Sequence, residues 1–188
     1  WSAPSADGGS AVTDYRVEVS SDNGSTWNQV NRTASTSTNQ AITGLSPAKN
    51  YVFRVSAINS VGLSPSISIT ATTLATIPTA ISDLQYSDLG ANGLKLSWSS
   101  PSYDGGSAVT DYKVEQSVDG TTWTTVQRTA STNTTQVVAG LTPAKNYQYR
   151  VSAVNQIGLG PASTAISITT LATTPSSVRS LAVGQLTS

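Results

Sequence analysis

The stretch LTPAKNYQYRVSAVNQIGLGP, residues 141–161, decides the fold, because nearly the same stretch, LSPAKNYVFRVSAINSVGLSP, occurs at residues 45–65. The two stretches are identical at 14 of 21 positions. After a Leu-x-Pro turn, apolar side chains recur at every second position, which is the pattern of a β-strand with one buried face. The chain therefore contains a β-rich unit that occurs more than once.

The duplication extends well beyond this stretch. WSAPSADGGSAVTDYRVEVS at 1–20 and WSSPSYDGGSAVTDYKVEQS at 98–117 share 16 of 20 residues at a spacing of 97. A third partial copy follows, since LATTPSSVRSLAVGQLTS at 171–188 corresponds to LATIPTAISDLQYSDLGA at 74–91. Solenoid repeats have only roughly 20 to 50 residues and cannot bury a core alone. Each of these longer units is therefore expected to fold independently.

The composition excludes several classes of function. The formal net charge is zero and no basic cluster occurs, so nucleic acid is not an expected partner. No run approaches the roughly 18 apolar residues of a membrane helix, and no membrane insertion is expected. Cys and His are both absent, which removes the usual metal ligands and the Ser-His and Cys-His dyads. We predict no cofactor, no metal site and no enzyme activity.

Within the second unit, period-two alternation and turn residues predict seven short strands, the number typical of a β-sandwich. The predicted ranges are 80–86, 93–99, 108–117, 122–128, 134–139, 145–155 and 163–170. Asp119-Gly120 here, and Asn23-Gly24 in the first unit, predict hairpin turns because these residues tolerate positive φ.

Several spaced residues carry a family resemblance. In the second unit they are Trp98, Pro101, Asp104-Gly105-Gly106, Tyr112-Lys113-Val114 and Leu141-x-Pro143-x-x-x-Tyr147-x-Tyr149-Arg150-Val151-x-Ala153-x-Asn155-x-x-Gly158. In the first unit they are Trp1, Pro4, Asp7, Gly8, Gly9, Tyr15, Leu45, Pro47, Tyr51, Arg54, Val55, Ala57, Asn59 and Gly62. This pattern resembles the fibronectin type III domain, and the resemblance covers the whole chain.

The resemblance implies an all-β fold class: tandem seven-stranded fibronectin type III, or immunoglobulin-like, β-sandwiches. Strands A, B and E would face strands C, C′, F and G. Tyr51 and Tyr147 would be tyrosine-corner residues, whose hydroxyls bond to backbone near the Leu-x-Pro turn. The inner face of strand C, with Tyr15, Val17 and Val19, would lie alongside strand F. Truncating Trp98 or Tyr147 should cost about 3 to 5 kcal/mol.

We predict three domains. Residues 1–75 form a domain that lacks its first strand, 76–172 form a complete domain, and 173–188 form the opening strand of a third. The first domain should then have an open edge and an uncovered core. Residues 175–187 would be a spare opening strand, with apolar positions at Val178, Leu181 and Val183. We expect such a strand to serve the next unit through a continuous polypeptide, because strand addition between subunits costs association entropy.

Carboxylates are the only candidate catalytic groups, and Glu18 and Glu115 are predicted in mid-strand. They alternate with core positions, so they should point outward beside Arg54 and Arg150 on the neighbouring strand. A cross-strand ion pair on an exposed sheet face is the interpretation we adopt. No catalytic residue is assigned.

The two Asp-Gly-Gly segments resemble a calcium or phosphate loop only superficially, because calcium takes six to eight oxygen ligands and one Asp is near in sequence. We interpret them as the B–C turns. Trp27 and Trp123 follow the C–C′ turns and are predicted to cover the sheet edge; the alternative is a platform that stacks on sugars.

Low charge, abundant Ser and Thr, absent Cys and the DGGSAVT phrasing look like the bacterial and phage surface-protein kind of this family. The first hypothesis is a non-catalytic structural array in a stalk, fibre or surface decoration of a bacterial cell or phage particle. It would be extracellular, on a cell or virion surface, with neighbouring repeats or like subunits as partners. The alternative is a spacer or accessory module of a secreted polysaccharide-degrading enzyme. The sequence identifies no carbohydrate or protein ligand.

Overall fold

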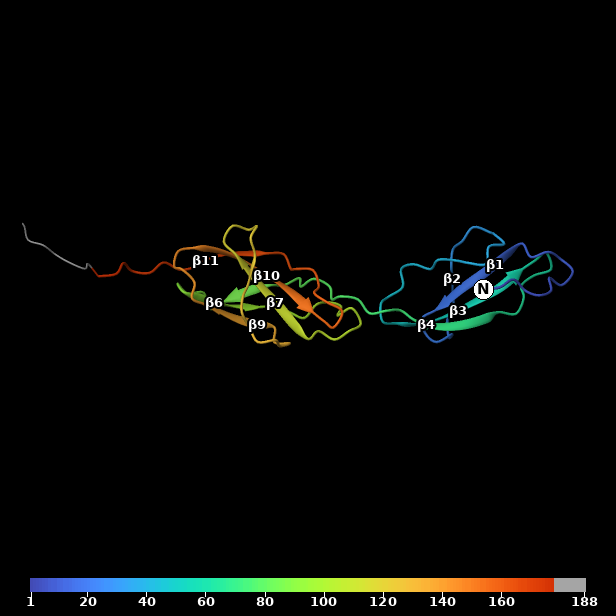
Figure 1. The fold of residues 1–188 in the computed structure, drawn as a ribbon, viewed down its shortest axis with the longest axis horizontal. Coiled ribbons are helices and arrows are strands. Elements are labelled where there is room, and N and C mark those ends of the chain that lie inside the picture. The colour runs from blue at the N-terminus through green and yellow to red at the C-terminus, as the bar shows by residue number, and fades with distance from the viewer. Residues whose placement is uncertain (178–188) are drawn as a thin grey trace, which may run out of the picture. The chain divides into compact units, whose positions relative to one another are not determined.

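The computed structural model describes residues 1–177, so the sequence prediction for Val178, Leu181 and Val183 lies outside the described residues. Every regular element in the described range is a β-strand, and all the pairings are antiparallel. The strands fall into two compact units, β1–β4 and β5–β11 (Figure 1). The all-β fold class is confirmed.

The second unit is a two-sheet sandwich. One sheet has the order β5-β6-β9, and the other has the order β11-β10-β7-β8. The bounds of the first sheet are β5 (Gln85–Ser87), β6 (Gly93–Ser97) and β9 (Thr135–Ala139). Those of the second are β7 (Asp111–Ser117), β8 (Thr124–Thr125), β10 (Asn146–Val154) and β11 (Ile166–Thr169). This is the predicted arrangement of A, B and E facing C, C′, F and G.

The core of the second unit lies between these sheets. Leu94 and Leu96 of β6 meet Val114 of β7 and Tyr149 and Val151 of β10, all of them buried. They occupy alternate positions along their strands, because successive side chains of a strand point to opposite faces. Full burial of each such side chain contributes about 1.5 to 3 kcal/mol.

Three predicted strands are at most half as long as expected, one of them the range 163–170, of which only β11 (Ile166–Thr169) is a strand. For the range 80–86, only β5 (Gln85–Ser87) forms a ladder. The buried residues before it, Ile81 and Leu84, are three positions apart, so they do not follow the two-residue period of a strand. Asp83 between them instead accepts a hydrogen bond from the Ser99 amide at 2.8 Å. The predicted range 122–128 contains only β8, which has two residues.

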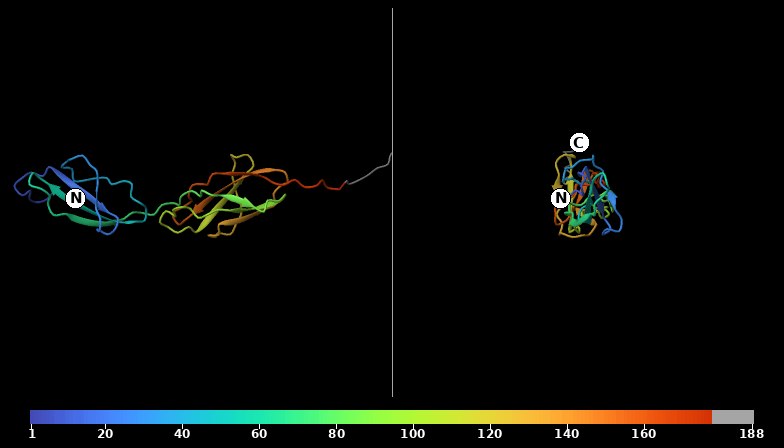
Figure 2. Two further views of the ribbon diagram at one scale, coloured as in Figure 1. Left: turned by 180° about the vertical axis from the view of Figure 1, so that it is seen from behind. Right: turned by 90° about the vertical axis from the view of Figure 1, so that its right-hand side faces the viewer.

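The first unit, seen from behind in the left view of Figure 2, contains a single sheet with the order β2-β1-β3-β4. Its strands are β1 (Asp14–Ser20), β2 (Asn28–Gln29), β3 (Asn50–Ile58) and β4 (Ile67–Thr72). Its described residues include no counterpart of β5 or β6. Residues 39–43, which correspond to β9, consequently have no strand to pair with and form no ladder.

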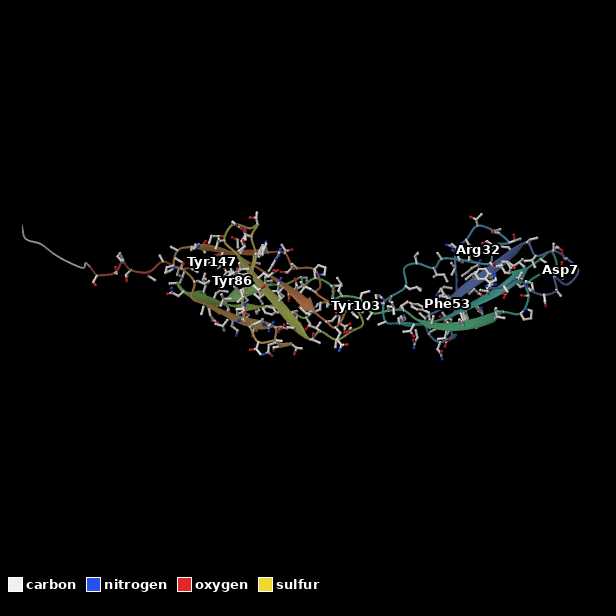
Figure 3. The ribbon with its side chains drawn as sticks, in the orientation of Figure 1. Asp7, Arg32, Phe53, Tyr86, Tyr103 and Tyr147 are labelled. Atoms are coloured by element: carbon white, nitrogen blue, oxygen red, sulfur yellow. The ribbon has the colours of Figure 1, made fainter. Side chains whose placement is uncertain are left out.

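The apolar face of this sheet is open as a result, as the sequence predicts. Val151 is 0% exposed, whereas its equivalent Val55 is only partly buried. Tyr149 is buried, but its equivalent Phe53, labelled in Figure 3, is also partly exposed. The difference follows from the covering strand, because side chains of β6 fill this space in the second unit alone.

The predicted tyrosine corners are both present. The Tyr51 hydroxyl accepts a hydrogen bond from the Ser46 amide at 2.9 Å. The Tyr147 hydroxyl accepts one from the Thr142 amide at 3.0 Å. Ser46 and Thr142 are the middle residues of the Leu-x-Pro turns, so each tyrosine ties the start of its strand to the preceding turn. Strand C also lies alongside strand F as predicted, with Val17 opposite Val55.

Candidate functional site: ion-pair clusters and an open end

The mid-strand glutamates pair with the predicted arginines. Glu18 lies opposite Arg54 across β1 and β3, and Arg54 Nε donates to Glu18 Oε2 at 2.7 Å. Glu115 lies opposite Arg150, whose Nε donates to Glu115 Oε2 at 2.9 Å. The cross-strand ion pairs are therefore confirmed in both units.

Their predicted exposure is wrong. Glu18 is 5% exposed and Glu115 is 7% exposed. An indole ring covers each pair, because the Arg54 guanidinium lies 4.0 Å from the ring centre of Trp27, and that of Arg150 lies 4.2 Å from the ring centre of Trp123. An arginine stacked on an aromatic face is an attractive cation–π contact. The sheet and the tryptophan together exclude water from the carboxylate.

The same geometry sets the ionisation of the glutamates. The Arg54 guanidinium lowers the pKa of Glu18 below its usual value and outweighs burial, which raises it; Arg16 adds to the lowering. For Glu115, burial is the largest single effect and raises the pKa. Lys113 and Arg150 together lower it by more than burial raises it, so the pKa of Glu115 lies below its usual value. A carboxylate whose pKa is lowered is a poor proton acceptor near neutral pH. These clusters are suited to joining strands.

Trp27 and Trp123 thus cover the outer face of the sheet over an arginine, in place of the sheet edge that the sequence predicts. The ring face that meets the arginine is occupied, so it is not a platform for a sugar. The sequence spacing places each tryptophan after its hairpin turn but does not show which strand the ring returns to.

The Asp-Gly-Gly segments are turns closed by their own aspartates. Asp7 Oδ1 accepts from the Gly9 amide at 2.9 Å, and Asp104 Oδ1 accepts from the Gly106 amide at 2.8 Å. Gly8 and Gly9 have φ of 72° and 80°, a region that favours glycine. Within residues 1–177, no group of three or more Asp or Glu residues could hold a metal ion. No helix long and apolar enough to span a membrane is found in that range either.

Sequence reasoning missed a second charged cluster. Arg32 Nη1 donates to Asp14 Oδ1 at 2.7 Å and to the Tyr15 carbonyl at 2.8 Å. In the second unit, Arg128 Nη1 donates to the Tyr112 carbonyl at 2.7 Å in the same way. Both guanidinium groups are buried, and they lie over Trp1 and Trp98. The sequence did contain a signal for this cluster, because Arg32 and Arg128 occupy equivalent positions in the two copies.

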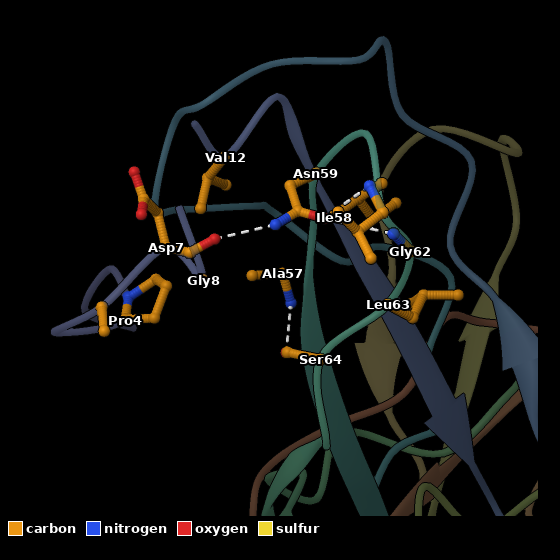
Figure 4. Close-up of a pocket in the computed structure, with 12 residues that line it drawn as sticks. Pro4, Asp7, Gly8, Val12, Ala57, Ile58, Asn59, Gly62, Leu63 and Ser64 are labelled. Atoms are coloured by element: carbon orange, nitrogen blue, oxygen red, sulfur yellow. Dashed lines mark hydrogen bonds between the residues drawn. The ribbon is translucent and has the colours of Figure 1, made fainter. Parts of the chain in front are cut away.

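One end of the first unit is hollow. A pocket of about 330 Å³ lies between the Asp-Gly-Gly turn and the loop that follows β3 (Figure 4). Asn59 spans it: its Nδ2 donates to the Asp7 carbonyl at 2.8 Å, and its Oδ1 accepts from the Gly62 amide at 3.1 Å. The other lining residues are mostly apolar, among them Pro4, Val12 and Leu63.

The open sheet face forms a second hollow, of about 480 Å³. Its lining is almost wholly apolar and comes from β1, β3, β4 and the segment opposite them. The principal residues are Trp1, Val17, Ile42, Phe53, Val55 and Ile69. Ile69 is 68% exposed, so its burial by a further segment would be favourable.

The two facing sheets, Tyr147 corner and repeated turns define an immunoglobulin-like β-sandwich module. The family model described as "Fibronectin type III domain" matches residues 1–73 and 79–169, which together make up most of the chain. The chain belongs to the fibronectin type III family.

Its relatives include long animal proteins. Titin from Drosophila melanogaster is 33% identical over 165 residues, which cover 85% of this chain and 1% of that protein. Myomesin-2 from Homo sapiens is 29% identical over 167 residues, covering 85% of this chain and 11% of that protein. "M-protein, striated muscle" from Gallus gallus is 29% identical over 170 residues, covering 87% and 12% respectively. The chain thus spans a small part of each.

A solved structure supports the fold. A crystal structure of titin domains matches with a TM-score of 0.50 and 24% sequence identity, covering 84% of this chain and 55% of that chain.

Proposed function

We propose that the chain is a non-catalytic structural segment, a series of sandwich repeats that sets distance along a stalk, fibre or surface decoration. The observation that carries the proposal is the equivalence of the two units. Both have the same buried glutamate–arginine pair under a tryptophan, the same tyrosine corner and the same Asp-Gly-Gly turn. Features held in common by both units stabilise each unit on its own, as a serial spacer requires.

The length of the relatives supports a serial role. The chain corresponds to 1% to 12% of titin, Myomesin-2 and M-protein, so in those proteins the matched region is a small part of a much longer polypeptide. All three are animal proteins. The bacterial or phage setting and the extracellular location remain part of the proposal and are supported by composition alone: low charge, abundant Ser and Thr, and no Cys.

The spacer role predicts a definite gain in length per repeat. The longest strand of each unit has nine residues, and at roughly 3.3 Å per residue this gives a unit about 30 Å long. Inserting one further copy of residues 79–175 after residue 175 should lengthen the particle by about that amount in small-angle X-ray scattering. A particle that broadens without lengthening would contradict the proposal.

The complete open reading frame separates the array from the accessory-module alternative. Many further copies at the 97-residue spacing would favour the array, whereas an adjoining catalytic domain for polysaccharide would favour the accessory module. In both cases we propose neighbouring repeats, or like subunits, as the partners.

A further inference from the structure

The sequence contains two Asn-Gly dipeptides, Asn23-Gly24 in the first unit and Asn92-Gly93 in the second. An asparagine before a glycine can lose its side-chain amide, because glycine has no side chain to hinder its nitrogen from reaching the asparagine Cγ and closing a succinimide ring. Both asparagines are exposed to solvent. The fold holds the two dipeptides differently, so it decides which one reacts.

Asn92 is held by its side chain and by its backbone. Its Nδ2 donates to the Leu141 carbonyl at 2.9 Å, and its own carbonyl accepts from the Leu141 amide at 3.0 Å. Gly93 begins β6 and lies opposite Ala139 of β9. A Cβ added to Gly93 would lie 2.6 Å from the Val138 oxygen, so the backbone is closely packed there. Ring closure would turn the asparagine away from Leu141 and break these hydrogen bonds.

Asn23 lies at the tip of the hairpin between β1 and β2. Its side chain makes no hydrogen bond to any of residues 1–177. The Gly24 amide donates to Ser20 Oγ at 2.8 Å, and Ser20 is fully buried. The Cγ that would be attacked is therefore free, and the nitrogen that would attack it is restrained by a neutral hydrogen bond.

The equivalent turn of the second unit lacks this asparagine, since Asp119 directly precedes Gly120. The Asp119 carboxylate accepts from the amides of Thr122 at 2.7 Å and Thr121 at 2.8 Å. These bonds hold the pKa of Asp119 well below its usual value. An ionised carboxylate resists attack by a nucleophile, so this turn is inert. The additional residue Asn23 thus gives the first unit a reactive group that the second unit does not have.

We propose that Asn23 is a site of spontaneous deamidation, slowed by the hydrogen bond between the Gly24 amide and Ser20. The Gly24 nitrogen attacks Asn23 Cγ, so that a bond between these two atoms forms and the Cγ–Nδ2 bond breaks. The proton of the Gly24 nitrogen leaves with the side-chain amide as ammonia. Water then adds to either carbonyl of the succinimide and opens it to aspartate or isoaspartate. No oxidation or reduction occurs, and water is the co-reactant.

The modification changes the turn in two ways. Either product adds a negative charge beside Asp22, and isoaspartate also lengthens the main chain by one carbon. Asp22 Oδ1 accepts from the Thr26 amide at 2.9 Å, which depends on the length of the turn. A Cβ added to Gly24 would lie 3.5 Å from Trp27 Cζ2, so the turn backbone is close to this ring. Deamidation should therefore loosen the hairpin that places Trp27 over Arg54.

Peptide mapping by mass spectrometry tests the proposal on the unsubstituted chain, incubated folded in mildly alkaline buffer. Asn23 should be converted at least about tenfold faster than Asn92, a ratio that corresponds to about 1.4 kcal/mol of additional hydrogen bonding to be broken at Asn92. In urea the two should react at similar rates, because both precede glycine. Equal rates in the folded chain would overturn the proposal, as would conversion of Asn23 in the unfolded chain alone.

Ser20→Ala removes the restraint on the Gly24 nitrogen. It should speed conversion of Asn23 by about threefold to tenfold, the equivalent of a hydrogen bond of about 0.6 to 1.4 kcal/mol. The matched control is Ser117→Ala, because Ser117 Oγ accepts from the Gly120 amide at 2.9 Å in the second unit. This control should leave the rate at Asn23 unchanged. Equal rates in the two variants would overturn the role of Ser20.

NMR separates a modification that alters the hairpin from one without structural effect. As conversion proceeds, the indole signal of Trp27 should shift and that of Trp123 should stay in place. Unmoved Trp27 signals in fully converted protein would contradict the loosening of the hairpin. Signals from β1 and β3 verify that the Ser20→Ala chain is folded. The proposal is independent of the spacer function, since its failure would leave the length gained per repeat unchanged.

Discussion

Replacing the equivalent valine in each unit by alanine compares the free-energy cost of the same change in an open and in a closed core. Val151 lies at 0% exposure between the two sheets, and its equivalent Val55 lies on the open face of the first unit. Valine to alanine removes two methylene equivalents, about 1.6 kcal/mol of transfer free energy, and the cavity left in a closed core raises the cost of Val151→Ala to about 2 to 3 kcal/mol. For Val55→Ala, water already reaches the side chain and no closed cavity forms, so the cost should stay below about 1 kcal/mol.

Hydrogen–deuterium exchange read by mass spectrometry separates the two units, because peptides from β3 and β10 report the opening free energy of each. The expected difference of about 1.5 kcal/mol corresponds to roughly tenfold in the opening equilibrium. Val137→Ala, at an exposed position of β9, is the control and should change the opening free energy by less than about 0.5 kcal/mol. Equal costs for Val55→Ala and Val151→Ala would refute the reasoning, since they would mean that both faces are covered alike.

Three further outcomes are expected. Tyr147→Phe should destabilise the second unit by about 1 to 3 kcal/mol in urea unfolding, because the Thr142 amide loses its acceptor; a cost no larger than that of Tyr86→Phe, an exposed tyrosine, would contradict the corner's role. The Ser20 and Thr26 side chains and the Thr26 amide lower the pKa of Asp22 to about 2 from 3.8, so its stabilising effect is complete above pH 4 and is lost as the pH falls toward 2. Asp22→Asn should therefore reduce the fall in melting temperature between pH 4 and pH 2. A fall as steep as in the unsubstituted chain would count against this. Millimolar calcium should not raise the melting temperature, whereas a clear rise would show a cation at the Asp-Gly-Gly turns.

Alternation of apolar residues and the turn residues beside it were enough to predict much of the fold. The two-residue period around Tyr149 and Val151 identified a half-buried strand and its inner face, and the Leu-x-Pro turn before Tyr147 identified the corner. These features depend on residues close together in sequence, where strand geometry alone decides which side chains share a face. The opening strand was predicted less well, because Ile81 and Leu84 are buried without the alternation that marks a ladder.

The burial of the charged clusters could not be predicted from residues close together in sequence. Pairing of Glu18 with Arg54 followed from the register of two strands, but the burial of the pair did not, because it depends on Trp27 returning across the sheet to lie on the guanidinium. The buried Arg32 was missed for a similar reason, since its acceptors lie 17 and 18 positions earlier in the chain.

By itself, the sequence determined that this chain is a series of β-sandwich repeats, because a duplicated pattern of alternation and turns specifies the same fold at each occurrence. The sequence also predicted an uncovered core in the first unit, but only the tertiary structure decided how far each equivalent residue is buried. Val55 and Val151 stand in nearly the same local sequence, yet one is open and the other sealed, because burial depends on whether a second sheet lies opposite. The pocket at Asn59 and its equivalent at Asn155, where the Thr76 carbonyl accepts from the asparagine side chain, differ for the same physical reason: a site is a property of what packs against it.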